Sequence, residues 1–164
     1  MSISVNTWKV PESSIVHVAS NMRQADIDEL WASQKVSPEH GLRASIIMSD
    51  YASPMIVNEL VVGIFGLVIS DGIIADGVPW FLGTNEVDEN PVGFIKASKN
   101  IIQVMQQWCP GLMNYVHADN EKSIRFLKKM GFSVYDQPEP VGVDGQLFYK
   151  FEKGIDRCAI QLQH

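Results

Sequence analysis

The spacing of apolar residues indicates helices in the first third of the chain. Apolar side chains recur every three or four positions over residues 11–22 and again over 24–33, as they do on one face of an α-helix. A third helix is predicted over 42–51, ending before Ser53-Pro54 because the residue that precedes a proline disfavours the α conformation. The chain is therefore expected to begin with helices.

Strand patterns follow these helices. Residues 55–57 and 60–69 are mostly apolar and are separated by a two-residue turn, as in an antiparallel hairpin. Asp-Gly pairs at 71–72 and 76–77 supply further turns, after which residues 79–83 form the next run of strand formers. The pattern predicts a meander of three strands.

The second half of the chain alternates helices with strands. A long helix is predicted over 91–108, where a proline opens the first turn and a Cys-Pro-Gly sequence follows the last. The later predicted elements are a strand over 112–118, a helix over 120–130 and strands over 132–135 and 146–151. Their order favours one α/β (α+β) domain over residues 1–164, with helices packed on a central sheet.

Composition agrees with a globular domain and excludes several function classes. Of the 164 residues, 46% are hydrophobic and 20% are charged, which suits a packed core. The net charge of −6 argues against specific nucleic-acid binding, because neutralising phosphates requires clustered Lys and Arg. The longest apolar run, ten residues, is shorter than the roughly 20 that span a bilayer, so no membrane partner is expected.

The cysteines and the first residues point to a reducing compartment. Cys109 and Cys158 are too few for a disulfide scaffold and lie in no metal-ligand spacing, so no metal site is expected. The first residues lack the basic and apolar regions of a secretory signal. A cytoplasmic location is therefore expected.

Residues 120–132 carry the most specific signal in the sequence. They read Asn-Glu-Lys-Ser-Ile-Arg-Phe-Leu-Lys-Lys-Met-Gly-Phe, in which Asn120 caps a helix and Gly131 lets the chain reverse into a strand. This segment resembles a motif of the GNAT N-acetyltransferases, typically N-x-x-[AS]-x-x-[FL]-Y-x-K-x-G-F. The resemblance implies a GNAT-like fold, a mixed central sheet of about six or seven strands flanked by helices.

A wider stretch resembles a narrower group. The runs at 80–84 and 114–116, the long helix between them and the segment that ends at Gly131 are similar to the GNAT-like internal virion protein A group of short-tailed bacteriophages. This resemblance covers residues 80–151, about half of the chain. It implies a bacteriophage protein of the virion or of virion assembly, located in the host cytoplasm or in the particle.

Resemblance to the GNAT family also implies a cofactor. Family members bind acetyl-CoA where the fourth and fifth strands diverge, and a substrate amine then attacks the thioester directly. Acetyl-CoA is therefore the candidate cofactor. The residues that the resemblance places at this site are Phe81, Leu82, Asn120, Lys122 and Ser123.

Two departures from the family pattern count against this chemistry. Active members usually carry a [QR]-x-x-G-x-[GA] run after the fourth strand, where backbone N–H groups at a helix N-terminus hold the pyrophosphate. The corresponding run here, residues 85–93, contains three acidic side chains and a proline, which bring like charge and remove a donor. Leu127 stands where many members have a tyrosine that protonates the leaving thiolate, and leucine has no proton to donate.

Glu86 and His117 are the catalytic candidates. Glu86 follows the strand at 79–83, where family members often have a carboxylate that accepts the proton of the amine. The same carboxylate also suits the N-terminus of the following helix through the helix dipole. His117 ends the next strand beside Asp119 and is suited to act as a base, although histidines at strand ends are more often merely hydrogen-bonded.

The helix over 120–130 also carries a basic cluster, Lys122, Arg125, Lys128 and Lys129. Three of these residues fall on one face at spacings i, i+3 and i+7. A solvated helix face accounts for such a pattern, and so does a contact with CoA phosphates or with an acidic partner. The sequence leaves these interpretations open.

Two functions are compatible with the sequence. The favoured one is a phage structural or assembly protein, an internal virion protein with a degenerate acyl-CoA site that acts through contacts with phage or host proteins. The alternative is an active acetyl-CoA-dependent N-acetyltransferase that modifies a host or phage protein. The acyl acceptor, the protein partners and the oligomeric state, monomer or homo-oligomer, are left open.

Overall fold

The structure, a computed structural model, describes residues 10–70 and 77–155. Its helices are α1 (Glu12–Ser20), α2 (Gln24–Gln34), α3 (Pro38–Met48), the short 3-10 helix η1 (Asn85–Asp88), α4 (Pro91–Trp108) and α5 (Glu121–Lys129). Its strands are β1 (Tyr51–Val57), β2 (Leu60–Ile69), β3 (Gly77–Gly83), β4 (Leu112–His117), β5 (Ser133–Val134) and β6 (Phe148–Lys153).

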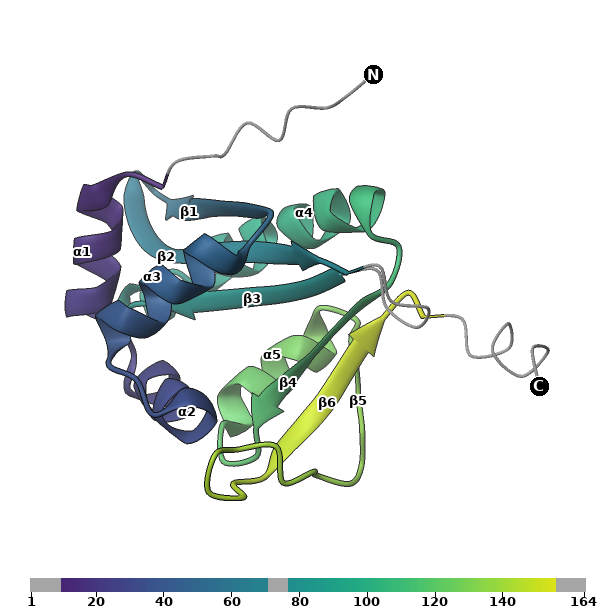
Figure 1. Ribbon diagram of the computed structural model, residues 1–164. Helices are drawn as coiled ribbons and strands as arrows, with labels where there is room; N and C mark the ends of the chain where they lie inside the picture. Colours follow the sequence, from purple (N-terminus) through teal and green to yellow (C-terminus); the bar gives the residue numbers. More distant parts are fainter. Residues whose placement is uncertain (1–9, 71–76, 156–164) are drawn as a thin grey trace.

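The strands form one mixed sheet. They lie in the order β1-β2-β3-β4-β6-β5, and every neighbouring pair is antiparallel except β3 and β4, which are parallel. Helices α1 and α3 lie on one side of β1, β2 and β3, and α4 lies on the other side (Figure 1). The fold class predicted from the sequence, a mixed sheet of about six or seven strands flanked by helices, is confirmed.

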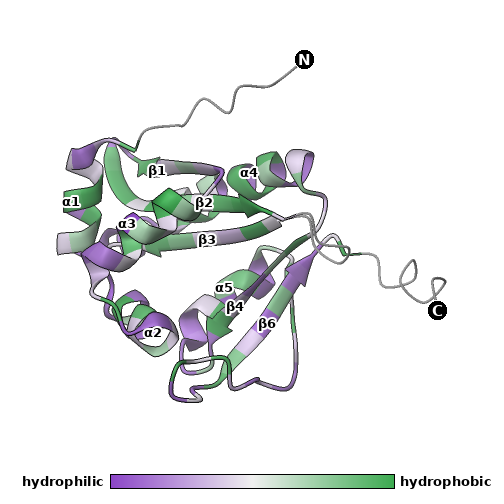
Figure 2. Ribbon diagram, in the orientation of Figure 1, coloured by the Kyte–Doolittle hydropathy of each residue, from purple (hydrophilic) through white to green (hydrophobic). Residues whose placement is uncertain are grey.

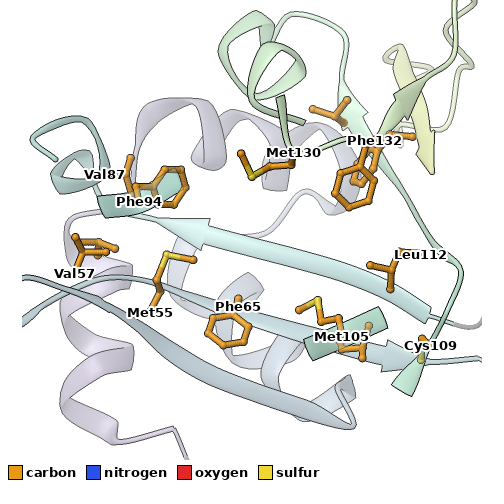
Figure 3. Packing of buried hydrophobic residues seen from close by; sticks show 14 residues of the cluster. Met55, Val57, Phe65, Val87, Phe94, Met105, Cys109, Leu112, Met130 and Phe132 are labelled. Carbon is orange, nitrogen blue, oxygen red and sulfur yellow. The ribbon is translucent and has the colours of Figure 1, made fainter. Parts of the chain in front are cut away.

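Strand β2 is the centre of the core because it is buried on both faces. Six consecutive residues, 62–67, are buried, and Figure 2 shows the strand as hydrophobic over most of its length. Ile64 packs against α1, α2 and α3, whereas Phe65 and Leu67 pack on the opposite face with residues of α4 (Figure 3). Burying each such side chain contributes about 1.5–3 kcal/mol, so these two clusters hold the helices on the sheet.

Capping residues set the helix boundaries. The Asn120 side chain accepts from the Ser123 N–H (3.2 Å), as predicted for a cap, and Gly131 adopts a left-handed φ of 91° just beyond α5. The predicted helix over 42–51 is wrong at both ends. Ser37 caps α3 by accepting from the His40 N–H (3.3 Å), so this helix begins at Pro38.

Strand boundaries differ from the predictions near prolines and at the sheet edge. Strand β1 begins at Tyr51 and runs through Pro54, because an edge strand has a free side on which a missing N–H costs nothing. Strand β6 covers 148–153 instead of 146–151, and β5 is shorter than predicted. The Asp-Gly pair at 71–72, Asp76 and Cys158 lie outside the described residues, whereas Cys109 is fully buried.

Candidate functional site

Strands β3 and β4 diverge immediately after they meet. Their one register pair is Gly77 with Leu112, and the Gly77 N–H donates to the Gly111 C=O (3.1 Å). In a parallel ladder the next bond would run from the N–H of residue 79 to the C=O of Met113. Residue 79 is a proline and has no N–H, so the ladder stops there and the strands separate (Figure 1).

The side chain of Asn114 occupies the place of the following ladder bond. Its Nδ2 donates to the Pro79 C=O (2.7 Å), and its Oδ1 accepts from the Tyr115 N–H (2.8 Å). These two backbone groups would otherwise bond to each other across the sheet. One amide side chain therefore satisfies both strands while keeping them apart.

Helix α2 satisfies the ends of both diverging strands. Asp26 accepts from the Gly83 N–H at the end of β3 (2.8 Å), and the Arg23 N–H donates to the Gly83 C=O (2.9 Å). Glu29 Oε2 accepts from the His117 N–H at the end of β4 (3.3 Å). Two carboxylates on successive turns of one helix thus bridge the open end of the sheet.

The divergence leaves a cleft of about 550 Å³ between β3 and β4. This volume lies within the roughly 300–1,000 Å³ typical of ligand pockets. Helices α2, α4 and α5 contribute the remaining walls, and the aromatic lining residues are Trp80, Phe81, Phe94, Tyr115, Phe126, Phe148 and Phe151. Phe94 stacks on Phe126 with ring centroids 4.9 Å apart, so the walls contributed by α4 and α5 are in contact.

Acidic groups of α2 lie at one side of this cleft. Burial, followed by the neighbouring charge of Asp26, raises the pKa of Glu29 to about 7, while the bonds from His117 and Asn120 oppose the shift only in part. Burial also raises the pKa of Asp26, although Arg23 binds both of its oxygens at 3.0 Å. Near neutral pH, Glu29 is divided between its protonated and ionised forms, as suits a group that exchanges protons.

The mouth of the cleft is crossed by an ion pair. Lys122 Nζ on α5 lies 2.6 Å from Asp88 Oδ1 at the end of η1, and both residues line the cleft. Their side chains are 67% and 47% exposed, so solvent screens the pair and it contributes only about 0–1 kcal/mol to stability. The other basic residues of α5, Arg125, Lys128 and Lys129, are exposed to solvent.

The N-terminal turn of α4 has few donors left for an anion. Pro91 has no N–H, the Gly93 N–H donates to Asn90 Oδ1 (3.0 Å) and the Phe94 N–H donates to the Asn90 C=O (3.0 Å). The preceding segment carries the carboxylates of Glu86, Asp88 and Glu89. This set of donors and charges does not fit the pyrophosphate of acetyl-CoA, which needs several free N–H groups and positive potential.

Most residues expected at a cofactor site do line the cleft. Phe81, Leu82, Lys122 and Ser123 belong to its walls, and so does Leu127. Their contact with a cofactor stays a prediction.

Asn120, the fifth residue expected there, serves the fold instead. It is buried, and its side chain caps α5 through Oδ1 and donates from Nδ2 to Glu29 (3.4 Å). Both ends of its amide are therefore used by neighbouring elements.

The side chains of the two catalytic candidates are bound to residues outside the cleft lining. Glu86 Oε2 contacts His17 Nε2 on α1 (3.3 Å) and Thr84 Oγ1 (3.2 Å). His117 Nδ1 accepts from the Asp119 N–H (3.2 Å), and neither candidate is among the described residues that line the cleft. Their catalytic roles stay predictions, and the structure does not bring them together at the cleft.

Sequence reasoning missed Asp26 and Glu29, the acidic pair in the cleft. The signal available was their spacing of three, which places both on the helix face that also carries Leu30 and faces the sheet. Tyr115, which also lines the cleft, was missed as well. Burial raises the pKa of Tyr115, and so do the charge of Glu139 and a hydrogen bond to it.

Neither a membrane span nor a metal site is found in residues 10–70 and 77–155. No helix there is long and apolar enough to cross a bilayer. No group of three or more His, Cys, Asp or Glu side chains there is arranged to hold a metal ion.

Comparisons with known proteins bear on the fold. No protein-family model matches the sequence, and no curated protein matches it. Among solved structures, ribosomal-protein-alanine N-acetyltransferase from Brucella melitensis matches with a TM-score of 0.64 and 13% identity, over 89% of this chain and 97% of its own. The acetyltransferase yncA from Salmonella typhimurium, solved with its cofactor acetyl-CoA, matches with a TM-score of 0.61 and 16% identity, over 90% and 92%.

A GNAT-family acetyltransferase from Bacillus anthracis matches with a TM-score of 0.59 and 12% identity, over 88% of this chain and 90% of its own. This chain has the GNAT fold. At such identities the likeness shows the fold alone, so the activity of a GNAT-fold protein has to be argued from its site. The family resemblance predicts that the fourth and fifth strands diverge, and in this chain the strands that diverge around the cleft are the third and fourth, β3 and β4.

Proposed function

We propose that this chain is a bacteriophage protein that keeps the GNAT fold as a scaffold and acts through contacts with phage or host proteins. Its role would be that of an internal virion or assembly protein, found in the host cytoplasm or in the particle. The resemblance of residues 80–151 to internal virion protein A supports the phage assignment. The observation that carries the proposal is the N-terminal turn of α4, which lacks an anion site.

The charge at this turn opposes a bound diphosphate. Two unit charges about 4 Å apart at the protein surface interact by about 4 kcal/mol, and Asp88 would repel a phosphate placed beside it. Lys122 could offset this repulsion only by leaving Asp88, to which it is bound at 2.6 Å. This turn therefore offers neither the free N–H donors nor the positive potential that tight binding of CoA requires.

Calorimetric titration with acetyl-CoA and with free CoA tests the proposal directly. We expect no binding heat and no thermal stabilisation at sub-millimolar ligand. Ligand at 100 times its Kd would stabilise the fold by about 2.7 kcal/mol, so a micromolar Kd would be evident and would overturn the proposal. An acetyltransferase that binds acetyl-CoA, titrated in the same buffer, is the positive control.

Mass spectrometry of purified phage particles and of assembly intermediates tests the biological role. We expect the chain to be present in particles or in assembly intermediates at a fixed ratio to other structural proteins. Recovery of the chain only as a free protein, in no particle and in no intermediate, would count against an assembly role.

An acetyl-CoA-dependent N-acetyltransferase acting on a host or phage protein is the second candidate. The observation that favours it is Glu29, a cleft-lining carboxylate whose pKa is raised to about 7 and which could accept a proton from an amine. The similar structure of yncA contains acetyl-CoA. Its test is thiol release from acetyl-CoA with a panel of amines and with host lysate, compared between the natural chain and Glu29→Gln.

A further inference from the structure

One residue of β3 has backbone groups that face the cleft without a strand partner. On this strand the backbone N–H and C=O groups of the odd-numbered residues point towards β4. The Gly77 N–H donates to the Gly111 C=O, and the Pro79 C=O accepts from Asn114 Nδ2. Gly83, at the far end, is satisfied by α2. Phe81 lies between Pro79 and Gly83, so its N–H and its C=O point into the gap on the β4 side; its register partner on β2 is Phe65, and it has no register pair with β4.

The facing position on β4 is Tyr115. In a continuous parallel ladder its C=O would accept from the Phe81 N–H, but β3 and β4 have no register pair here. The His117 N–H, which would donate to the Phe81 C=O, donates instead to Glu29 Oε2 (3.3 Å). The two facing strand edges are thus held apart by Asn114 at one end of the gap and by α2 at the other, with main-chain groups left between them.

We propose that this gap binds an extended segment of a partner protein, which pairs with β3 at Phe81 and with β4 at Tyr115. Such strand addition gives affinity through main-chain hydrogen bonds and specificity through the alternating side chains. The cleft of about 550 Å³ has room for a few residues, which at about 3.3 Å of rise each match the open part of the two strands. The inference rests on the proposed function, action through protein contacts.

Charge identifies the segment as basic. Asp26 and Glu29 line the cleft together with Arg23, which is bound to Asp26, and Glu29 forms no ion pair among the described residues. A lysine or arginine of the segment would neutralise the charge of Glu29. An acidic or phosphorylated segment would be repelled by the carboxylates of Glu29 and Asp88. Aromatic walls suit apolar side chains at the alternate positions.

Entry to the gap requires little rearrangement. The pair between Lys122 and Asp88 crosses the mouth, but both side chains are largely exposed and the pair is easily broken. No other ion pair within the described residues joins the loop of η1 to α5.

Selection from a display library of random seven-residue peptides on the full-length chain tests the inference. Selected peptides, resynthesised with capped ends, are expected to carry Lys or Arg between apolar residues. Bound to the labelled chain, they should slow hydrogen exchange of the Phe81 N–H at least tenfold. Failure to enrich any peptide, or peptides that leave the Phe81 N–H unprotected, would overturn the inference.

Two matched pairs of variants locate the bound peptide. Ser123→Trp fills the cleft, whereas Arg125→Trp places the same side chain on the exposed face of α5, so we expect at least tenfold weaker binding only for the former. Glu29→Gln should weaken the binding of a lysine-containing peptide tenfold. It should leave unchanged the binding of the same peptide in which that lysine is replaced by alanine. Equal affinity for all variants would overturn the inference even where one of them folds poorly.

The coenzyme titration keeps the two conclusions separate. If neither CoA nor any peptide binds, this inference fails while the scaffold function stands. If CoA binds with micromolar Kd and no peptide does, both fail.

Discussion

Replacing Glu29 by Gln should stabilise the fold at neutral and alkaline pH. Glu29 lies where α2 meets the end of β4 and forms no ion pair among the described residues. Gln keeps a carbonyl oxygen that can accept from the His117 N–H and from Asn120 Nδ2, and it removes the buried charge. The substitution therefore isolates the cost of ionising this carboxyl in the folded state.

The size and sign of the effect follow from proton linkage. The pKa of Glu29 rises from 4.5 to about 7 on folding, so the folded state binds more protons than the unfolded state between these values. Its stabilising contribution is complete below pH 4.5 and is lost as the pH rises through 7. Each pKa unit corresponds to about 1.4 kcal/mol. Because Glu29 is partly exposed to the cleft, we expect its ionisation to lower the free energy of unfolding by about 2 kcal/mol.

Urea unfolding of the natural chain and of Glu29→Gln between pH 4.5 and 8.5 measures this difference. The two proteins should be nearly equal at pH 4.5, and the variant should be about 2 kcal/mol more stable at pH 8, or about 4–8 °C higher in Tm. Asp28→Asn, on an exposed position of the same helix, is the matched control and should show no such pH dependence. A difference in free energy of unfolding that stays constant from pH 4.5 to 8.5 would contradict a raised pKa of Glu29 in the folded state.

Three further substitutions test polar groups around the cleft. Asn114→Ala leaves the Pro79 C=O and a strand N–H without partners, so urea unfolding should show a loss of about 2 kcal/mol. Arg23→Ala removes the cation that binds Asp26, and the buried carboxylate left behind should cost about 3–5 kcal/mol at pH 8, with a smaller loss under acidic conditions where Asp26 is protonated. Asp88→Asn breaks only an exposed pair, and calorimetric scanning should show a change below about 1 kcal/mol.

Local signals were sufficient for most of the secondary structure. The limits of β2 and α4 match the predicted ranges because a long apolar run and a proline-initiated amphipathic helix are set by nearby residues. The start of α3 differs from the prediction although Ser37 and Pro38 form a cap signal. The start of β1 differs because the predicted strand begins only after Pro54, whereas β1 runs through it. A proline is tolerated there only because β1 is an edge strand, a property of the assembled sheet.

The site was less accessible to sequence reasoning. The family resemblance assigns Phe81, Leu82, Lys122 and Ser123 to an acetyl-CoA site; they line the cleft, and their contact with a cofactor stays a prediction. Glu29 was not found, because an acidic residue on a helix is ordinarily exposed, and nothing local reveals that α2 crosses the strand ends. Its pKa shift arises from burial by distant elements and from Asp26, three positions earlier.

The order of helices and strands, the capped helix that ends at Gly131 and the acidic, proline-containing segment before α4 can be read from the amino-acid sequence, because each depends on neighbouring residues. The separation of β3 and β4 after one pair and the position of α2 across the opening depend on contacts between distant residues. The physical reason is that Pro79 and Asn114 are 35 positions apart, and their effect on one ladder exists only once the parallel strands meet.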